Sequence, residues 1–362
     1  MAMLMALFAV TACARHGNIQ VQPPGFSHSA TDSARTLVQA LVERERLPGF
    51  AITVYSGRQL IWNEGFGFAD LETRTPATPG TRFRIGSVSK LLTAMTLMRL
   101  SQVGVVDLDV PIGQSVESLP PHLREITLRQ LAGHLAGIRH YRGNEFLSMT
   151  SCETLSDGLV VFESDSLVAA PGSRYAYSSY GYNLIGAVLE GITRQPFPEI
   201  VGRHVLMPLG MAATVPDSSG ESHPRRARTY MINEIGVAVA PSDDLSCRWP
   251  SGGYLSSTDD LADLGSVAIT PAVLDAPWLE VMLAPQQTIS GEATSVGVGW
   301  RVSVDSRGRR YFHHGGSSNG GAAFLLVYPR EQIVVAMASN AFAQWGEGDA
   351  LAIADIFIDG SQ

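Results

Sequence analysis

Lys90 is the residue with the clearest chemical potential, because it is the only lysine among the 26 lysines and arginines of the chain. An arginine stays protonated in proteins, whereas a lysine in a desolvated site can lose its proton near neutral pH. Ser87 precedes it by three residues, and side chains at that spacing lie on one side of a helix. The pair predicts a serine nucleophile whose proton is exchanged with a lysine amine. The alternative is a plain helix cap followed by a solvated lysine.

The residues around this pair predict the element that holds it. Apolar residues recur at helical spacing after Ser87, so a buried helix is expected to begin there. Ser87 would then lie on the first turn, where free backbone N–H groups and the helix dipole favour developing negative charge.

Two later segments could complete a site. Residues 171–182 contain four tyrosines before an apolar run, and their spacing alone favours a turn before a core helix. Residues 313–320 read His-His-Gly-Gly-Ser-Ser-Asn-Gly and are expected to join two strands. Glycines there allow the backbone to approach a ligand closely and to present N–H donors.

In this order, the three segments resemble the serine beta-lactamase and penicillin-binding-protein superfamily. Within it the chain is most similar to the beta-lactamase-related serine hydrolases and the LACTB-type serine proteases. That family reads Ser-x-x-Lys, then Tyr-x-Asn or a variant, then Lys/His-x-Gly, which here are residues 87–90, 177–179 and 314–316. Further family-like stretches are residues 126–141 and 251–261, and the resemblance covers residues 31–358.

The resemblance implies a role for each of these positions. Ser87 would form an acyl-enzyme with an ester or amide carbonyl. Lys90 and Tyr177 would transfer protons, in an order that stays open, and the backbone N–H groups of Ser87 and Ser317 would form the oxyanion hole. The implied substrate-binding positions are Ser179, His314, Gly315 and Gly316. His134 is expected to be structural rather than catalytic.

The expected activity is that of an esterase, a peptidase or a D-Ala carboxypeptidase-like enzyme, without a cofactor or a metal. Its substrate would be a small ester, peptide or beta-lactam. Ser179 stands where many members carry Asn, and His314-Gly315-Gly316 replaces Lys-Thr-Gly. A histidine is mostly neutral at pH 7, so this change favours substrates that lack the usual carboxylate. An arginine placed by the fold could restore the charge.

The sequence also bears on three other functions. A catalytically silent binding or scaffold domain is the main alternative, although Ser87, Lys90 and Tyr177 are all present. An α/β-hydrolase requires a histidine after its serine and acid, and no histidine follows His314. A metal hydrolase is disfavoured because the nine histidines include no His-Glu-x-x-His.

The remaining pattern predicts an α+β fold. Strands are expected at 50–55, 59–68, 296–304, 309–314, 322–328 and 333–338, and flanking helices at 31–46 and 350–358. The two chain ends would therefore build one antiparallel sheet covered by helices, with residues 88–290 as a mainly helical lobe inserted in a domain of residues 31–358.

The N-terminal segment predicts export. Residues 1–14 are apolar, and Val-Thr-Ala-Cys at 10–13 resembles a lipobox, which would make Cys13 a lipidated membrane tether in the bacterial envelope. The missing positive charge opposes a signal, and without one the chain would be cytoplasmic. Residues 15–30 are expected to form a linker. Cys152 and Cys247 are far apart in sequence, so we expect buried, unpaired thiols.

Bulk composition restricts the partners. The net charge is −8, and the densest basic cluster, residues 225–228, is expected to be a solvated loop. These features argue against a nucleic-acid surface. Beyond residue 14 no apolar stretch approaches the roughly 20 residues that span a bilayer.

Overall fold

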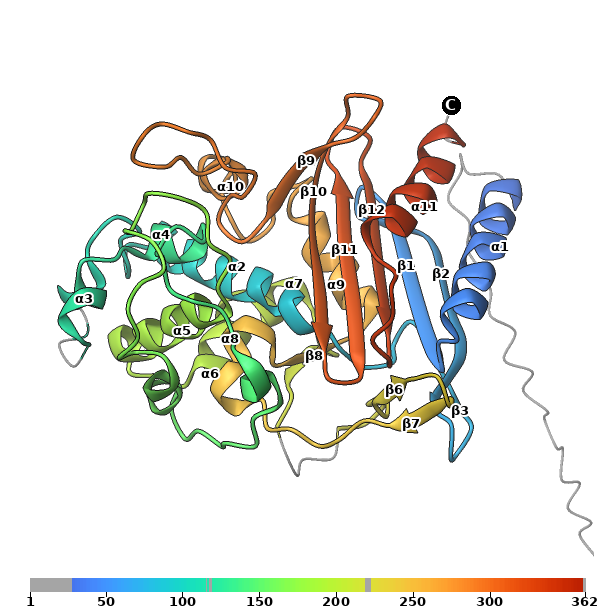
Figure 1. Ribbon diagram of the computed structural model, residues 1–362. Helices are drawn as coiled ribbons and strands as arrows, with labels where there is room; N and C mark the ends of the chain where they lie inside the picture. Colours follow the sequence, from blue (N-terminus) through green and yellow to red (C-terminus); the bar gives the residue numbers. More distant parts are fainter. Residues whose placement is uncertain (1–27, 115, 117–118, 219–222, 361–362) are drawn as a thin grey trace, which may run out of the picture.

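A seven-stranded antiparallel sheet lies beside a mainly helical lobe in the computed structural model, which describes residues 28–114, 116, 119–218 and 223–360 (Figure 1). The strands, in pairing order, are β3 (Thr75–Pro76), β2 (Gln59–Asp70), β1 (Gly49–Ser56), β12 (Ile333–Ser339), β11 (Gly321–Tyr328), β10 (Arg310–Ser318) and β9 (Arg301–Val304). β1 pairs with β12, Phe50 opposite Ser339, so the two ends of the chain meet at the centre. This confirms the predicted α+β fold.

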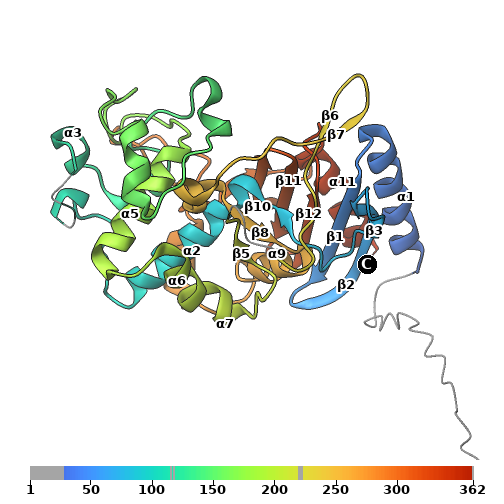
Figure 2. The ribbon, with the colours of Figure 1, turned by 90° about the horizontal axis from the view of Figure 1, so that it is seen from below.

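The two faces of the sheet are covered by different helices, as the alternation of side chains along a strand requires. On β1, Phe50 and Ile52 pack with α1 (His28–Glu45) and α11 (Glu347–Asp359) on one face. Thr53 faces the other side, where its hydroxyl hydrogen-bonds that of Thr258 at 2.9 Å on α9 (Thr258–Ser266). Figure 2 shows the sheet between these layers.

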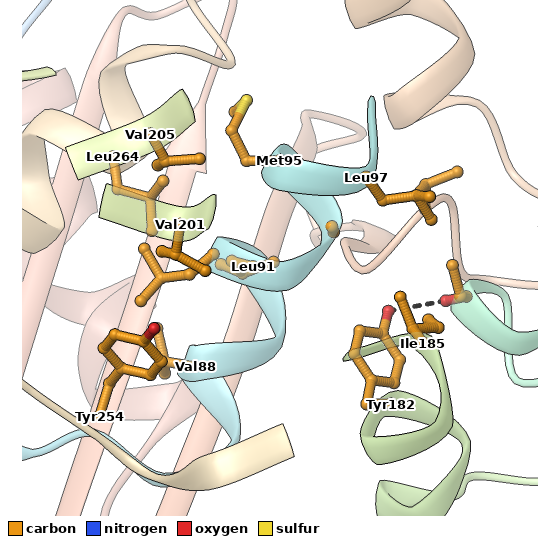
Figure 3. Packing of buried hydrophobic residues seen from close by; sticks show 14 of the residues in the cluster. Val88, Leu91, Met95, Leu97, Tyr182, Ile185, Val201, Val205, Tyr254 and Leu264 are labelled. Carbon is orange, nitrogen blue, oxygen red and sulfur yellow. Dashed lines mark hydrogen bonds between the residues drawn. The ribbon is translucent and has the colours of Figure 1, made fainter. Parts of the chain in front are cut away.

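The helical lobe is built around α2 (Ser89–Gln102), which is buried on nearly all sides. Figure 3 shows Leu91 of α2 among Val201, Val205 and Tyr254. The other helices are α3 (Pro121–Arg124), α4 (Leu128–Ala132), α5 (Ser179–Thr193), α6 (Phe197–Val201), α7 (Met207–Leu209), α8 (Trp249–Gly252) and α10 (Ala276–Leu283). Short strands form two smaller sheets. One pairs β4 (Phe83–Arg84), β8 (Tyr254–Ser256) and β5 (Val215–Pro216), and the other is the hairpin of β6 (Tyr230–Ile232) and β7 (Val237–Val239) near the end of the large sheet (Figure 1).

The structure differs from the predicted elements in several places. The first helix begins at His28, and α9, inside the segment expected to form the helical lobe, covers the sheet instead. The predicted strand at 296–304 begins only at Arg301, because the Gly297 N–H donates to the Trp300 carbonyl and folds the preceding residues into a turn. Gly315 and Gly316 do not join two strands but lie inside β10.

The prediction of two unpaired thiols is wrong. Cys152 and Cys247 form a disulfide, with their Cα atoms 5.1 Å apart. A separation of 95 residues gives no sequence signal for this pairing, because tertiary folding alone brings the two segments together. The disulfide ties the loop before residue 155 to the turn that leads into α8.

The predicted signal segment of residues 1–14, its Cys13, and residues 15–27 of the predicted linker lie outside the described residues. Within the described ranges, the helices are too short or too polar to cross a bilayer.

Candidate active site

Ser87 lies on a single 3-10 turn, Gly86–Val88, between β4 and α2. The backbone of β10 packs directly against this turn, and two glycines allow the approach. A Cβ on Gly316 would lie 2.0 Å from the Ile85 carbonyl oxygen and 2.8 Å from the Ser87 nitrogen. Gly86, at φ +48°, would bring a Cβ within 2.7 Å of the Ser317 nitrogen. These contacts bring the backbone of Gly316 and Ser317 directly against the turn that carries Ser87.

Lys90 is fully buried one turn after Ser87, and its Nζ is held by three oxygens. It donates to the Ser87 Oγ at 3.0 Å, to the Ser179 Oγ at 3.0 Å and to the Ser251 carbonyl at 2.7 Å. Burial lowers the pKa of Lys90 from its ordinary value to about 7; the nearby Tyr141 opposes this shift and Arg301 adds to it. The amine can therefore gain and lose a proton near neutral pH while touching the serine.

Tyr177 reaches the same serine from the extended segment before α5. Its hydroxyl donates to the Ser87 Oγ at 3.0 Å. Burial raises the pKa of Tyr177 above its ordinary value, while the hydrogen bond to Ser87 and the charge of Arg301 act in the opposite direction. The phenol therefore keeps its proton at neutral pH. Lys90 and Tyr177 thus converge on one oxygen from different elements.

Two histidines hold the tyrosine segment in place. The Nδ1 atoms of His134 and His140 accept hydrogen bonds, each 3.2 Å long, from the backbone N–H groups of Ser178 and Ser179. Both rings also contact the Tyr177 ring, with centroids 4.4 Å and 5.2 Å away. Burial lowers the pKa of both imidazoles, that of His140 to about 4, so both stay neutral acceptors. His134 has the structural position expected from the sequence.

A cleft of about 460 Å³ opens above Ser87. Of the predicted site residues, it is lined by Ser87, Tyr177, Ser179, Gly315, Gly316 and Ser317. Lys90 lies beneath it, at hydrogen-bonding distance from two of these residues. The structure therefore brings together the three sequence segments that were expected to form a site.

His314 is placed differently. Its side chain is 2% exposed, it does not line the cleft, and its Nδ1 donates to the Gly315 carbonyl at 2.7 Å. Burial, with Lys90 and Arg301 nearby, holds the pKa of His314 well below its ordinary value. The expectation that this side chain faces the substrate therefore fails on geometry. Successive side chains of a strand point to opposite faces of the sheet. The part of β10 that lines the cleft is Gly315 and Gly316, which follow His314.

Arg301 is the half-buried cation that lines the cleft instead. It lies on β9, opposite His313 of β10, and its guanidinium carbon is 5.6 Å from the Tyr177 ring centroid. It lines the cleft, and no salt bridge to a described carboxylate occupies it. The sequence predicted only that some arginine could restore the missing positive charge. The predicted hairpin of 296–304 and 309–314 pairs Val304 with Arg309 and therefore Arg301 with Phe312, one residue away from the observed partner.

Two other contributors carried no clear sequence signal. The Ser251 carbonyl that accepts from Lys90 is a backbone group, supplied 161 residues away by α8. His140 lines the cleft while it supports Ser179.

Comparisons with known proteins identify the family of the chain. The Beta-lactamase family model matches residues 34–357, almost all of the described chain. The chain belongs to the beta-lactamase family. This family includes serine hydrolases, and the resemblance found in the sequence is thereby confirmed.

Individual relatives are distant. The human serine beta-lactamase-like protein LACTB, a mitochondrial protein, is 27% identical over 310 residues, which cover 66% of this chain and 56% of LACTB. The chain thus spans a little over half the length of this curated relative.

Two solved structures share the fold. The octameric penicillin-binding protein homologue from Pyrococcus abyssi superposes with a TM-score of 0.76 at 24% identity, covering 90% of this chain and 75% of that one. A D-stereospecific amidohydrolase from Streptomyces sp. gives a TM-score of 0.74 at 22% identity, covering 91% and 98%.

Proposed function

We propose that this protein is a serine hydrolase that cleaves ester or amide bonds through an acyl-enzyme on Ser87. One observation carries the proposal: a buried lysine with a pKa of about 7 lies 3.0 Å from the Ser87 Oγ, and a protonated tyrosine donates to the same atom. A nucleophile, a base and an acid therefore meet at one point, as covalent catalysis needs.

The geometry supports a definite division of labour. Neutral Lys90 takes the Ser87 proton as Oγ attacks the carbonyl carbon, and the oxyanion is held by the N–H groups of Ser87 and Ser317. Tyr177 then donates its proton to the leaving atom as the bond to carbon breaks, and the Lys90 ammonium restores the proton to the phenolate. A water molecule repeats the sequence in reverse to release the acid and free Ser87. Lys90 is thus assigned as the base, which sequence reasoning left open.

A covalent probe tests this proposal. The protein is incubated with a fluorophosphonate, and the adduct is located by intact mass and peptide mapping. We expect one adduct, on Ser87, lost in Ser87→Ala and kept in Ser89→Ala, whose hydroxyl faces the Tyr254 N–H instead. Failure of fluorophosphonates, esters and penicillin alike to label Ser87 would favour the alternative, a silent binding domain.

The charge of Arg301 supports a substrate with a carboxylate in its leaving portion. Arg301 lies beside Tyr177, the group that protonates the leaving atom, and it is the arginine that the cleft offers to an anion. This proposal replaces the preference for uncharged substrates inferred from His314. Peptides and beta-lactams with a free carboxylate meet the requirement.

A matched pair of substrates tests the charge. Arg301→Gln is expected to lower kcat/KM for a peptide with a free terminal carboxylate by about 10- to 100-fold, the range of a charge-assisted hydrogen bond. The same peptide ending in a carboxamide should change little. Arg310→Gln is the control, because Arg310 is directed toward the Phe312 ring and the Leu283 carbonyl. Equal losses on both peptides would contradict the assignment.

We also infer that the chain works outside the cytoplasm. The Cys152–Cys247 disulfide supports this, because disulfides persist mainly in oxidising compartments. Fractionation of a bacterium that expresses the full chain is the test. Membrane association that disappears in Cys13→Ala is the expected result, and purely cytoplasmic protein would contradict it.

A further inference from the structure

The cleft continues into a second cavity at the end of β10. This cavity holds about 260 Å³ and shares Phe146, Ser317 and Phe342 with the main cleft. Its other walls come from the β6–β7 hairpin, through Met231 and Ile232, and from the turn after β10. Apolar side chains from three separate segments therefore meet beside the nucleophile.

Two of these side chains are unusually open to solvent for their type. Phe342 is 56% exposed and Met231 is 46% exposed. A single exposed apolar residue needs no explanation, but a group of them that rims a hollow marks a binding surface.

The floor of the cavity is firmly built. The Asn319 side chain donates to the Pro241 carbonyl at 2.6 Å, and the Asn319 backbone carbonyl accepts from buried Arg84 at 3.0 Å. Gly320, at φ +70°, leaves room for the hairpin, since a Cβ there would lie 2.5 Å from the Thr229 Cβ. The Tyr230 N–H donates to the Asn340 carbonyl at 2.9 Å. These contacts hold the β6–β7 hairpin in place beside the turn after β10, so the cavity is preformed.

The direction of the substrate follows from the active-site groups. In the proposed mechanism the Ser317 N–H holds the carbonyl oxygen, and Tyr177 protonates the leaving atom. Arg301 lies beside Tyr177 and lines the same cleft, so these two residues mark the leaving-group side. The acyl substituent of a carbonyl points away from its leaving group. Along β10 that direction runs from Ser317 toward residues 318–320, where the second cavity begins.

We propose that this cavity is the acyl-side specificity pocket, and that it takes an unbranched or aromatic apolar acyl group of about six to eight carbons. The inference rests on the proposed acyl-enzyme function. Its size follows from the volume, at about 30 Å³ for each water-sized group. Substrates that combine an apolar acyl group with a charged leaving portion fit the two ends of the cleft.

The test is a series of p-nitrophenyl esters from acetate to octanoate, with the second-order rate constant for acylation of Ser87 as the readout. The hexanoate-to-acetate ratio is expected to be about 10 to 100, because each added methylene leaves water. Met231→Glu should lower this ratio about tenfold or more. Using a ratio removes any effect of a changed fraction of folded enzyme.

Met207→Glu is the matched control, because Met207 is 71% exposed on α7 and outside both cavities. It should leave the ratio unchanged, and Phe342→Ser should lower it as Met231→Glu does. A hexanoate-to-acetate ratio near one in the wild type, or a ratio that Met231→Glu leaves unchanged, would contradict the proposed pocket. Acylation of Ser87 in the same experiment would still support the proposed function. A change in oligomeric state without a change in the ratio would make the hairpin an assembly surface and overturn the pocket as well. If no ester acylates Ser87, both proposals fall together.

Discussion

Two buried cations lie six residues apart and behave in opposite ways. Arg84 is 6% exposed and forms salt bridges with Asp217 at 2.7 Å and Asp243 at 2.5 Å. Burial disfavours its charge, but these two carboxylates raise the pKa of Arg84 further above its ordinary value. Lys90 is fully buried among hydroxyl and carbonyl oxygens, with no described carboxylate as its partner, and its pKa falls to about 7. Counter-ions make one cation a structural clamp, and their absence gives the other the lowered pKa that its proposed role as a base requires.

Replacing each cation with methionine separates these roles. The larger effect, on the rate of acylation, is expected for Lys90. Lys90→Met should slow acylation by about 10²–10⁴-fold, the usual contribution of general acid–base catalysis. The free energy of unfolding should change by only about 1–2 kcal/mol, because neutral oxygens lose a hydrogen bond and no charge is left unpaired. Rates of ester turnover and urea unfolding of the same preparation measure both.

Lys90→Arg provides the control for charge. It keeps a cation but not an amine that titrates near neutrality, so it should lose the acylation rate as well. Near-normal turnover in either variant would show that Lys90 is not the base.

Arg84→Met should have the reverse profile, with its main effect on stability. It leaves Asp217 and Asp243 buried without their main partner, so the free energy of unfolding should fall by about 3 kcal/mol. This loss of unfolding free energy is at the low end of the range for broken buried ion pairs, because Arg226 and Arg248 still contact these carboxylates. Arg58→Met, on an exposed turn, should change stability by less than about 0.5 kcal/mol. Equal unfolding midpoints for the two variants would contradict the clamp.

The pH dependence is the smallest and most specific expectation. Acylation should rise through a midpoint at about pH 7, falling about tenfold per unit below it, because protonated Lys90 cannot accept the Ser87 proton. Between about pH 7 and 10.5 the unfolded chain binds more protons at this residue than the native protein. The contribution of Lys90 to stability therefore rises with pH across that window.

Arg301→Gln should move this midpoint upward by less than about one unit, since removing a nearby positive charge favours the protonated amine. The pH profile of the acylation rate constant measures the shift. A midpoint that moves downward would show that Arg301 does not act on Lys90 through its charge.

The spacing of residues along the sequence predicted those contacts that join residues close together in the chain. The contact between Ser87 and Lys90 follows from their three-residue separation, and the β1–β2 hairpin from two β-rich runs around a Ser-Gly turn. Tyr177 was found only through the resemblance, because its own surroundings favoured a plain turn.

What escaped prediction depends on contacts between distant segments. The disulfide, the Ser251 carbonyl and the burial of His314 each result from packing that no local pattern encodes. The register of Arg301 was missed as well, because the predicted strand ends place it opposite Phe312 and the observed partner is His313.

The pairing of β1 with β12 also has a consequence for synthesis of the chain. The first strand of the sheet, Gly49–Ser56, waits for a partner that the ribosome makes almost 300 residues later, at Ile333–Ser339. Such non-local pairing is slow and late in folding. Ser87, Lys90 and Tyr177 are translated long before β10 can bring the Ser317 amide against the serine. If Ser87 is the nucleophile, as proposed, the growing chain carries it in an incomplete site, and the site is complete only when the sheet closes.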